Sequence, residues 1–519
     1  MKMKNILKYF IVSGAAVAML SSCDLNLLPT TDIAYEEGGE LFLTENDVTA
    51  FQNGVMASYR ALQYGVYTQT SEVQCDGFNA TIDYGNNYGA VHRCDNSFTP
   101  GEYDTEDMWS NHYIAIKNYN IAIANADNVK EELKASAKVL KGIALFCRAS
   151  SYLTLTRHFG NAYDPATASS DLSVPLVLKY DQLEKPARAT VKAVYDQIIT
   201  DLNEAESLLS EAAAAGITIT VKTDKVNLAG QVRAGVPTVD AVKALKARYY
   251  LDIQDYENAA ANAESVLASA AGYKLASTPE EMVAEYTNDA GTEPIIQLFA
   301  SMTEGVVGNT IFTQVGNDDT VGKYFSPYFI PSSLLVNAYD ATDLRLSNWF
   351  TNSLYPVKMS GSYYDGVYVF TKYLDNPGLH SGTIETGAHA AKPLLISEMY
   401  LIAAEAYAQS GNSGAAQSVI NQLQAARKAV NTTGSLENIK KEWFRETVGE
   451  GLRLTSIKRW GDGLAVRAEQ SGVQNLIMTG EYYNQRALSA DSHYLNWPVP
   501  SYEIKLNSNL VQNPGYTAE

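Results

Sequence analysis

An internal repeat constrains the fold of this chain more than any other feature. Five positions that begin at Leu245 recur at five positions that begin at Ile402, with the same spacings of two, three, nine and seven residues. The first set is Leu245, Ala247, Tyr250, Ala259 and Val266, and the second is Ile402, Ala404, Tyr407, Ala416 and Leu423. Small residues alternating with large ones at helix–turn–helix spacing are typical of tetratricopeptide units. Two units are too few for a solenoid, so we expect degenerate further units from helices predicted at 114–158 and 190–209.

The stretch between the two repeat units differs in composition. The frequency of Gly, Asn, Asp, Tyr and Pro is higher across residues 272–392, which indicates loops with short strands and helices. Residues 64–108 also lack helical periodicity. The sequence therefore predicts a mainly α fold with a tetratricopeptide-like helix-pair scaffold and a loop-rich insertion face. The expected parts are one domain at 41–519, with scaffold at 41–271 and 393–470, the insertion at 272–392 and a C-terminal tail at 471–519.

The first residues have the pattern of a lipoprotein export signal. Three lysines precede an apolar run at 11–20, and Leu20-Ser21-Ser22 lead to Cys23. A basic region, a short apolar region and small residues, in that order, describe a secretory signal. We predict a signal peptide at 1–22 and a lipid anchor and tether at 23–40, with diacylglycerol and palmitate-type chains on Cys23. The alternative is cleavage elsewhere, which would leave an incidental thiol.

Net charge and cysteine content limit the kinds of partner and the kinds of site that we expect for this chain. A net charge of −19 would repel a phosphate backbone, so nucleic acid is not an expected partner. No CxxC pair occurs, and we predict neither a metal site nor a cofactor. Cys147 lies in an apolar helical run and is interpreted as core. Cys75 and Cys94 either form a disulfide or remain free, and the sequence leaves both possibilities open.

A search for catalytic motifs finds none of the common ones. HExxH, GxSxG, P-loop and EF-hand patterns are absent, and the six histidines are scattered without ligand spacing. We therefore predict no catalytic residues. The two catalytic carboxylates of a glycosidase are recognised by their spatial arrangement and not by a sequence motif. Because the chain has 58 acidic residues, a surface glycoside hydrolase remains an alternative.

Aromatic residues provide the positive signal for binding. The chain has 34 tyrosines, and they crowd into the two irregular regions. An aromatic ring can cover the apolar face of a sugar while Asn and Asp bond its hydroxyls, and a peptide would be served by similar chemistry. The alternative is that these rings wedge loops onto the scaffold. The candidate ligand-binding residues are Asp76, Phe78, Asn79, Tyr84, Asn87, Tyr88, Phe98, Tyr103, Tyr324 and Tyr328.

Several short motifs in a fixed order resemble the SusD/RagB family. The clearest are Trp497-Pro498-Val499-Pro500, Gln512-Asn513-Pro514-Gly515-Tyr516, Glu450-Gly451-Leu452-Arg453 and Lys458-Arg459-Trp460-Gly461. The chain departs from the family at Leu394-Leu395-Ile396, where an arginine is common. The retained charges Glu442, Arg445, Glu450, Arg453 and Arg459 are interpreted as scaffold ion pairs.

The resemblance implies a function as well as a fold. It implies a lipoprotein on the extracellular face of the outer membrane that captures a nutrient for a SusC-like TonB-dependent transporter. The implied ligand is a glycan, or alternatively an oligopeptide, and the family brings no catalytic residues. Asp76 and the stretch from Phe98 to Tyr103 are the closest positional matches to residues that line pockets in the family. A purely structural assembly factor is a third and weaker hypothesis.

Overall fold

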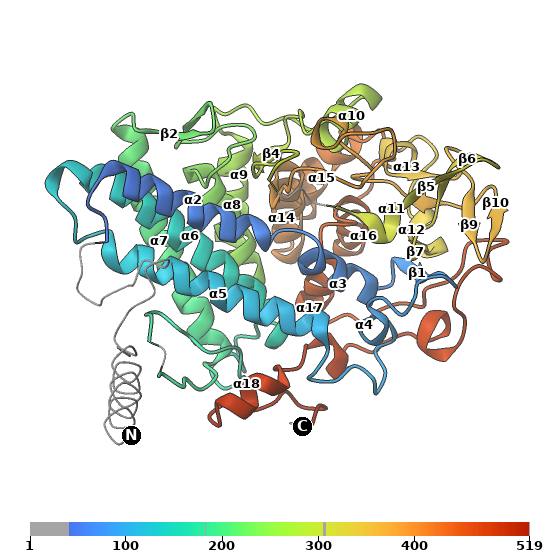
Figure 1. Ribbon diagram of the computed structural model, residues 1–519, viewed down its shortest axis with the longest axis horizontal. Coiled ribbons are helices and arrows are strands. Elements are labelled where there is room, and N and C mark those ends of the chain that lie inside the picture. The colour runs from blue at the N-terminus through green and yellow to red at the C-terminus, as the bar shows by residue number, and fades with distance from the viewer. Residues whose placement is uncertain (1–40, 182, 305–307, 518–519) are drawn as a thin grey trace, which may run out of the picture.

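The computed structural model describes residues 41–181, 183–304 and 308–517, and these are mostly helical (Figure 1). Cys23 and the predicted signal peptide lie outside the described residues. The scaffold helices stand side by side and fill the left and the centre of the view. They are α2 (Glu45–Ala61), α5 (Tyr103–Asn125), α6 (Lys134–Phe159), α7 (Val191–Ala214), α8 (Val239–Asp252), α9 (Tyr256–Leu267), α14 (Ile396–Gln409), α15 (Ser413–Ala426), α16 (Leu436–Glu446) and α17 (Arg453–Trp460).

The two repeat units form equivalent helix pairs, α8–α9 and α14–α15. Ala247 and Ala404 are fully buried at matching positions, where a small residue allows the helices to approach. Both turns place a residue in the left-handed region, Gln254 at φ +64° and Gly411 at φ +77°. Asp255 and Asn412 then cap the second helix of each pair by accepting a backbone N–H bond. The predicted helix-pair scaffold is confirmed.

The scaffold is continuous in space although the insertion interrupts it in sequence. Neighbouring helices pack in the order α5, α6, α7, α8, α9, and α9 then packs directly against α14. A short antiparallel pair joins β4 (Pro294–Ile296) of the early insertion to β12 (Leu394–Leu395), the segment that leads directly into α14. The insertion therefore leaves the scaffold and returns to it at one place.

Short elements make up the rest of the described chain. Its largest sheet has the order β10-β9-β6-β5, with a parallel contact only between β6 and β9. The strands of this sheet are β5 (Val315–Asp318), β6 (Gly322–Phe325), β9 (Val357–Met359) and β10 (Ser362–Tyr364). Two-stranded antiparallel pairs are β1 (Phe78–Ala80) with β7 (Phe329–Pro331), β2 (Thr218–Val221) with β3 (Asp224–Asn227), and β8 (Phe350–Thr351) with β11 (Val369–Phe370).

The remaining helices are short. They are α3 (Val66–Gln74), α4 (Gly89–Arg93), α10 (Pro279–Tyr286), α11 (Thr310–Thr313), α12 (Ser333–Val336), α13 (Leu344–Trp349) and α18 (Ser501–Leu506). Single turns of 3₁₀ helix occur at Glu131–Leu133, Pro377–Leu379 and His493–Leu495, and a π-helical turn occurs at Glu481–Gln485. The predicted loop-rich insertion with short strands is confirmed.

Three hydrophobic cores hold these parts together, and the smallest includes residues of β6 and β9. The largest core lies in the scaffold and includes Cys147, which is fully buried as predicted. The C-terminal tail closes it: Trp497 is buried, and its Nε1 donates to Gln74 Oε1 at 2.7 Å. The second core lies under the insertion and contains Phe78 and Trp349. Cys75 and Cys94 are free buried thiols, so of the two possibilities the structure has the unpaired one.

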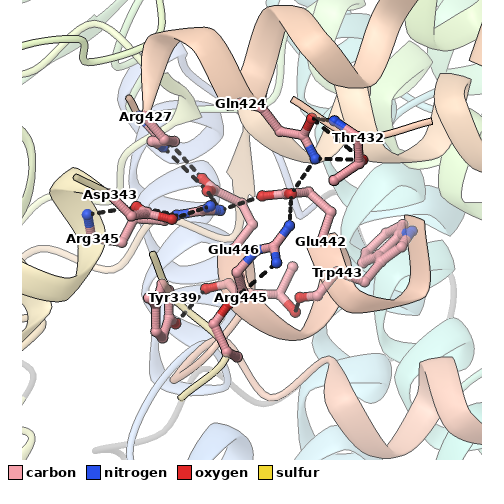
Figure 2. A network of polar contacts seen from close by, with 12 residues as sticks. Tyr339, Asp343, Arg345, Gln424, Arg427, Thr432, Glu442, Trp443, Arg445 and Glu446 are labelled. Atoms are coloured by element: carbon pink, nitrogen blue, oxygen red, sulfur yellow. Dashed lines mark hydrogen bonds and ion pairs between the residues drawn. The ribbon is translucent and has the colours of Figure 1, made fainter. Parts of the chain in front are cut away.

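A buried network of charges fastens the insertion to the scaffold (Figure 2). Arg345 of α13 binds Glu442 at 2.6 Å and Glu446 at 2.9 Å, both on α16. Arg427, directly after α15, binds Glu446 at 2.5 Å and Glu293 at 2.7 Å. Burial by itself raises the pKa of Glu446, but Arg427 and Arg345 outweigh it and lower that pKa to about 2.

The other retained charges are also paired. Arg453 binds Asp76 at 2.9 Å, Arg459 binds Glu405 at 2.8 Å, and Lys372 binds Glu450 at 2.8 Å. The prediction of scaffold ion pairs is confirmed. The fold is intact at Leu394-Leu395-Ile396, where the sequence departs from the family pattern. Nearby Glu398 is paired with Arg248 of α8 at 2.6 Å.

Candidate functional site

Four tyrosines gather where α3, α4 and α5 begin; we call Tyr64, Tyr67, Tyr88 and Tyr103 the tyrosine cluster. The chain turns from α2 into α3 through Gly65, whose φ of +61° suits a residue without a Cβ. This turn brings Tyr64 and Tyr67 to the surface as half-buried rings. Tyr88 precedes α4 with φ +53°, and Tyr103 is the first residue of α5 and is 68% exposed.

The pKa values of three of these tyrosines are raised by burial, by one another and by nearby carboxyl groups. Burial raises the pKa of Tyr67 to about 12, and the Asp107 carboxylate, Tyr64 and Tyr103 add to that rise. Burial also raises the pKa of Tyr88, with Asp104 and Tyr103 contributing. A side-chain hydrogen bond with Asp107 raises the pKa of Tyr103. The cluster is therefore a group of aromatic faces beside two carboxyl groups at the first turns of α5.

Polar side chains line the same place. Gln69 Oε1 accepts from Tyr88 Oη at 3.2 Å, and Gln69 Nε2 donates to Asn309 Oδ1 at 3.2 Å. Asn309 comes from the insertion and is held by its Nδ2, which donates to the Lys372 carbonyl at 3.2 Å. Burial, with Glu102 and Asp107 adding to it, raises the pKa of Asp104 to about 7. The site thus has amide groups and a carboxyl group that can carry its proton near neutral pH.

A cleft of about 130 Å³ opens beside the cluster and is lined by Tyr64, Tyr67, Gln69 and Asn309. Charged side chains also line the cleft, and they occur in pairs. Arg248 binds Glu398 at 2.6 Å, Lys392 binds Asp289 at 2.5 Å, and Glu450 binds Lys372 at 2.8 Å. Aromatic faces with amide groups and neutralised charges suit the binding of a polar ring compound.

Three of the residues predicted from sequence lie at this site. Tyr88 and Tyr103 belong to the tyrosine cluster itself. Asn87 is exposed next to Tyr88, and its Nδ2 donates to the Tyr84 carbonyl at 2.7 Å. That bond directs the Asn87 amide toward its own loop and leaves its Oδ1 available.

Five other residues predicted from sequence are buried. The Asp76 carboxylate is fully buried and binds Arg453 at 2.9 Å. Phe78 packs with Phe312 at a ring distance of 4.3 Å in the second core. The others are equally internal: Asn79 is 1%, Tyr84 6% and Phe98 2% exposed. Their side chains pack inside the protein, as expected of residues that hold loops against the scaffold.

The two candidates from the insertion lie elsewhere. Tyr324 on β6 lies against Gly316 of β5, and its ring is 5.8 Å from that of Tyr363. Lys358 lies 4.5 Å from the centre of the Tyr324 ring, so these residues form a second aromatic surface on the four-stranded sheet. Tyr328 is half-buried at the edge of the second core.

Sequence reasoning missed four residues of the site: Tyr64, Tyr67, Gln69 and Asn309. They fall within the two irregular stretches, which was the available signal. Tyr64 and Tyr67 flank a helix start, however, and Asn309 is far away in sequence. Among the described residues, no group of three or more His, Cys, Asp or Glu could hold a metal ion. Within the same residues, no helix is long and apolar enough to cross a membrane.

Comparisons with known proteins cover both halves of the chain. A family model described as starch-binding, associating with the outer membrane, matches residues 29–231. The model of the SusD family matches residues 247–516, which is more than half of the chain. SusD-like protein P2 from Formosa agariphila is 25% identical over 98% of this chain and 100% of its own length.

Solved structures have the same fold. A SusD superfamily protein from Bacteroides thetaiotaomicron has a TM-score of 0.73 at 22% identity, over 91% of this chain and 100% of that chain. A laminarin binding SusD-like protein has a TM-score of 0.67 at 20% identity, with the same two coverages. The architecture described above is therefore one already seen in solved proteins.

Proposed function

The chain belongs to the SusD/RagB family, and on that basis we propose that it captures a glycan at the tyrosine cluster. The observation that carries this proposal is the meeting of four tyrosines with Gln69 and Asn309 beside a cleft. A sugar ring has an apolar C–H face and a rim of hydroxyls. Tyrosine rings cover the face, and amide groups bond the rim.

The charge around the cluster favours a neutral ligand. Glu102 and Asp107 lie at the start of α5, where their carboxylates would repel a strongly anionic glycan. The described relatives support testing glucan-type ligands first, since one family description names starch and one solved structure is named for laminarin. An oligopeptide is the second candidate, because tyrosine faces and amide groups also suit a peptide backbone.

The proposed setting is the outer surface of the cell. We propose that Cys23 carries the lipid anchor, and that the protein works on the extracellular face of the outer membrane. The proposed partner is a SusC-like TonB-dependent transporter, which receives the captured glycan. The family description, with its association to the outer membrane, supports this proposal.

Calorimetric titration with starch oligosaccharides, laminarin oligosaccharides and an oligopeptide tests the site. We expect one of the glycans to bind and the double variant Tyr67→Ala, Tyr103→Ala to weaken that binding at least thirtyfold. Loss of one central aromatic residue commonly costs about 2 kcal/mol, which is about thirtyfold in affinity. Tyr103→Phe is the matched control: it keeps the ring and should retain affinity within a few fold.

A second variant distinguishes the two aromatic surfaces. Tyr363→Ala alters the surface on the four-stranded sheet and should leave binding unchanged. If Tyr363→Ala abolishes binding while the double variant binds normally, the site belongs on the sheet. Product analysis after prolonged incubation with the bound glycan separates capture from hydrolysis, because sustained turnover would support the glycoside hydrolase alternative.

A further inference from the structure

A second cavity lies apart from the tyrosine cluster. It has a volume of about 420 Å³, which is within the roughly 300–1,000 Å³ of small-molecule sites. One wall is the β2–β3 hairpin and the segment after it, and the other is formed by residues near β4 and by 376–390. Figure 1 shows β2 and β4 along the upper edge of the molecule, whereas α3 and α4 lie lower.

Unusual backbone conformations concentrate at this cavity. Ten non-glycine residues of the described chain have a clearly positive φ, and three of them line the cavity: Lys222, Arg233 and Asp289. Lys222 lies in the turn between β2 and β3, and this hairpin turn explains its positive φ. Arg233 and Asp289 are not in such a turn. Left-handed conformations of this kind cost free energy and persist where the surroundings hold them, commonly at ligand sites.

Asp289 connects several segments at this cavity, and its carboxylate has both an ion-pair partner and hydrogen-bond donors. Its carboxylate binds Lys392 at 2.5 Å and accepts from Asn376 Nδ2 at 2.6 Å and the Ala390 N–H at 2.9 Å. The Arg233 backbone N–H donates to the Pro294 carbonyl at 2.8 Å. The backbone of both residues is therefore held firmly in its left-handed conformation.

Arg233, Asp224 and Gln297 line this cavity and have unused bonding capacity. Arg233 forms no ion pair with any described residue, and its Nη1 makes one long bond of 3.4 Å to the Asp289 carbonyl. Gln297 Nε2 donates to the same carbonyl at 2.9 Å, but its Oε1 is buried and has no partner among the described residues. Phe299 supplies an apolar wall, and Lys222 Nζ lies 4.6 Å from the centre of its ring.

We propose that this cavity is a binding site for a small organic carboxylate that carries hydrogen-bond donors. The Arg233 guanidinium pairs with the ligand carboxylate, for which its planar fork is well suited. When the Gln297 amide turns toward the cavity, its Oε1 accepts from a donor on the ligand, which satisfies a buried oxygen. Two ligand sources share this chemistry: a uronic acid, whose donors are hydroxyls, and a free amino acid, whose donor is an ammonium group.

The test is calorimetric titration of the full chain with galacturonic acid, glucuronic acid and alanine, and with galactose and glucose as neutral counterparts. We expect one of the carboxylates to bind and the neutral sugars to bind at least tenfold more weakly here. Arg233→Asn should weaken carboxylate binding at least tenfold. Asn tolerates the left-handed conformation, so the backbone at this position is kept.

Lys225→Asn is the matched control, because it makes the same change in charge as Arg233→Asn. Lys225 lies on β3, close to Arg233 in sequence, and does not line the cavity. It should leave binding unchanged. Gln297→Leu is a second variant that removes the unpartnered oxygen, and it should also weaken binding. Binding of uronic acids alone assigns the site to acidic sugars, and binding of alanine alone assigns it to amino acids.

Two results overturn the proposal: no carboxylate binds at millimolar concentration, or Arg233→Asn and Lys225→Asn weaken binding equally. The second result would mean that net charge, rather than this cavity, attracts the ligand. The Tyr67→Ala, Tyr103→Ala variant should bind the carboxylate as the wild type does, so the outcome is independent of the glycan site.

Discussion

Replacement of Arg427 by Met tests whether the buried charge network holds the insertion on the scaffold. The Arg427 side chain is fully buried and contacts Glu293 at 2.7 Å and Glu446 at 2.5 Å. It also donates to the Ala276 carbonyl at 2.8 Å. Methionine has a similar length but no charge, so the variant leaves two carboxylates buried with one cation fewer. Removing one partner of a buried ion pair costs about 3–5 kcal/mol, and we expect a loss of that size.

The assay is equilibrium unfolding in urea, repeated from pH 7 down to pH 3. The pKa of Glu446 in the folded protein is about 2, below its usual 4.5 in the unfolded chain. Its ionisation therefore stabilises the fold above pH 4.5, and this contribution is lost as the pH falls toward 2. Because Arg427 lowers this pKa more than Arg345 does, Arg427→Met removes most of that contribution, and the difference between variant and wild type should be largest above pH 4.5 and should shrink below it.

A surface ion pair provides the control. Lys441 binds Glu437 at 2.7 Å, but the two side chains are 60% and 78% exposed. Lys441→Met should change the free energy of unfolding by less than about 0.5 kcal/mol, since exposed pairs contribute little. The reasoning is refuted if Arg427→Met costs less than 1 kcal/mol at pH 7, or if its cost does not change between pH 7 and pH 3.

Three further predictions follow from burial and from the export signal. Ala404→Phe should overpack the contact of α14 with its neighbours and cost about 1–3 kcal/mol in urea unfolding, and an unchanged midpoint would contradict the packing. Burial raises the pKa of Glu72 to about 7, so its ionisation opposes folding as the pH rises from 4.5 to 7. The free energy of unfolding of Glu72→Gln relative to wild type should therefore rise by roughly 3 kcal/mol between pH 4.5 and 7.5. A difference in unfolding free energy that is constant with pH would exclude this pKa. Cys23→Ala should yield an unacylated protein that leaves the detergent phase, and continued detergent partitioning would exclude Cys23 as the anchor.

Local patterns predicted the scaffold well, for a physical reason. The spacings around Ala247 and Ala404 are properties of a single helix pair, and a helix pair forms from residues close in sequence. The same applies to Cys147, whose apolar neighbours at helical spacing placed it in the core. Charges at helical spacings, such as Glu442 and Arg445, were correctly interpreted as ion pairs because both lie on α16.

Which aromatic residues face solvent was decided only by contacts between distant segments. Phe78 and Tyr103 lie in the same irregular stretch and are both aromatic. Strand β1 pairs with β7 of the insertion, which buries Phe78, whereas Tyr103 at the start of α5 stays exposed. No local pattern records that pairing, because its two strands are about 250 residues apart.

The sequence by itself determined the helix pairs, the irregular character of the insertion and the family. The tertiary structure alone decided the site: it placed Asn309 next to Gln69, and it set Arg233 at the same cavity as Gln297. The reason is that periodicity reports how a residue sits on its own helix or strand. A binding site depends instead on how loops from separate parts of the chain are packed against one another.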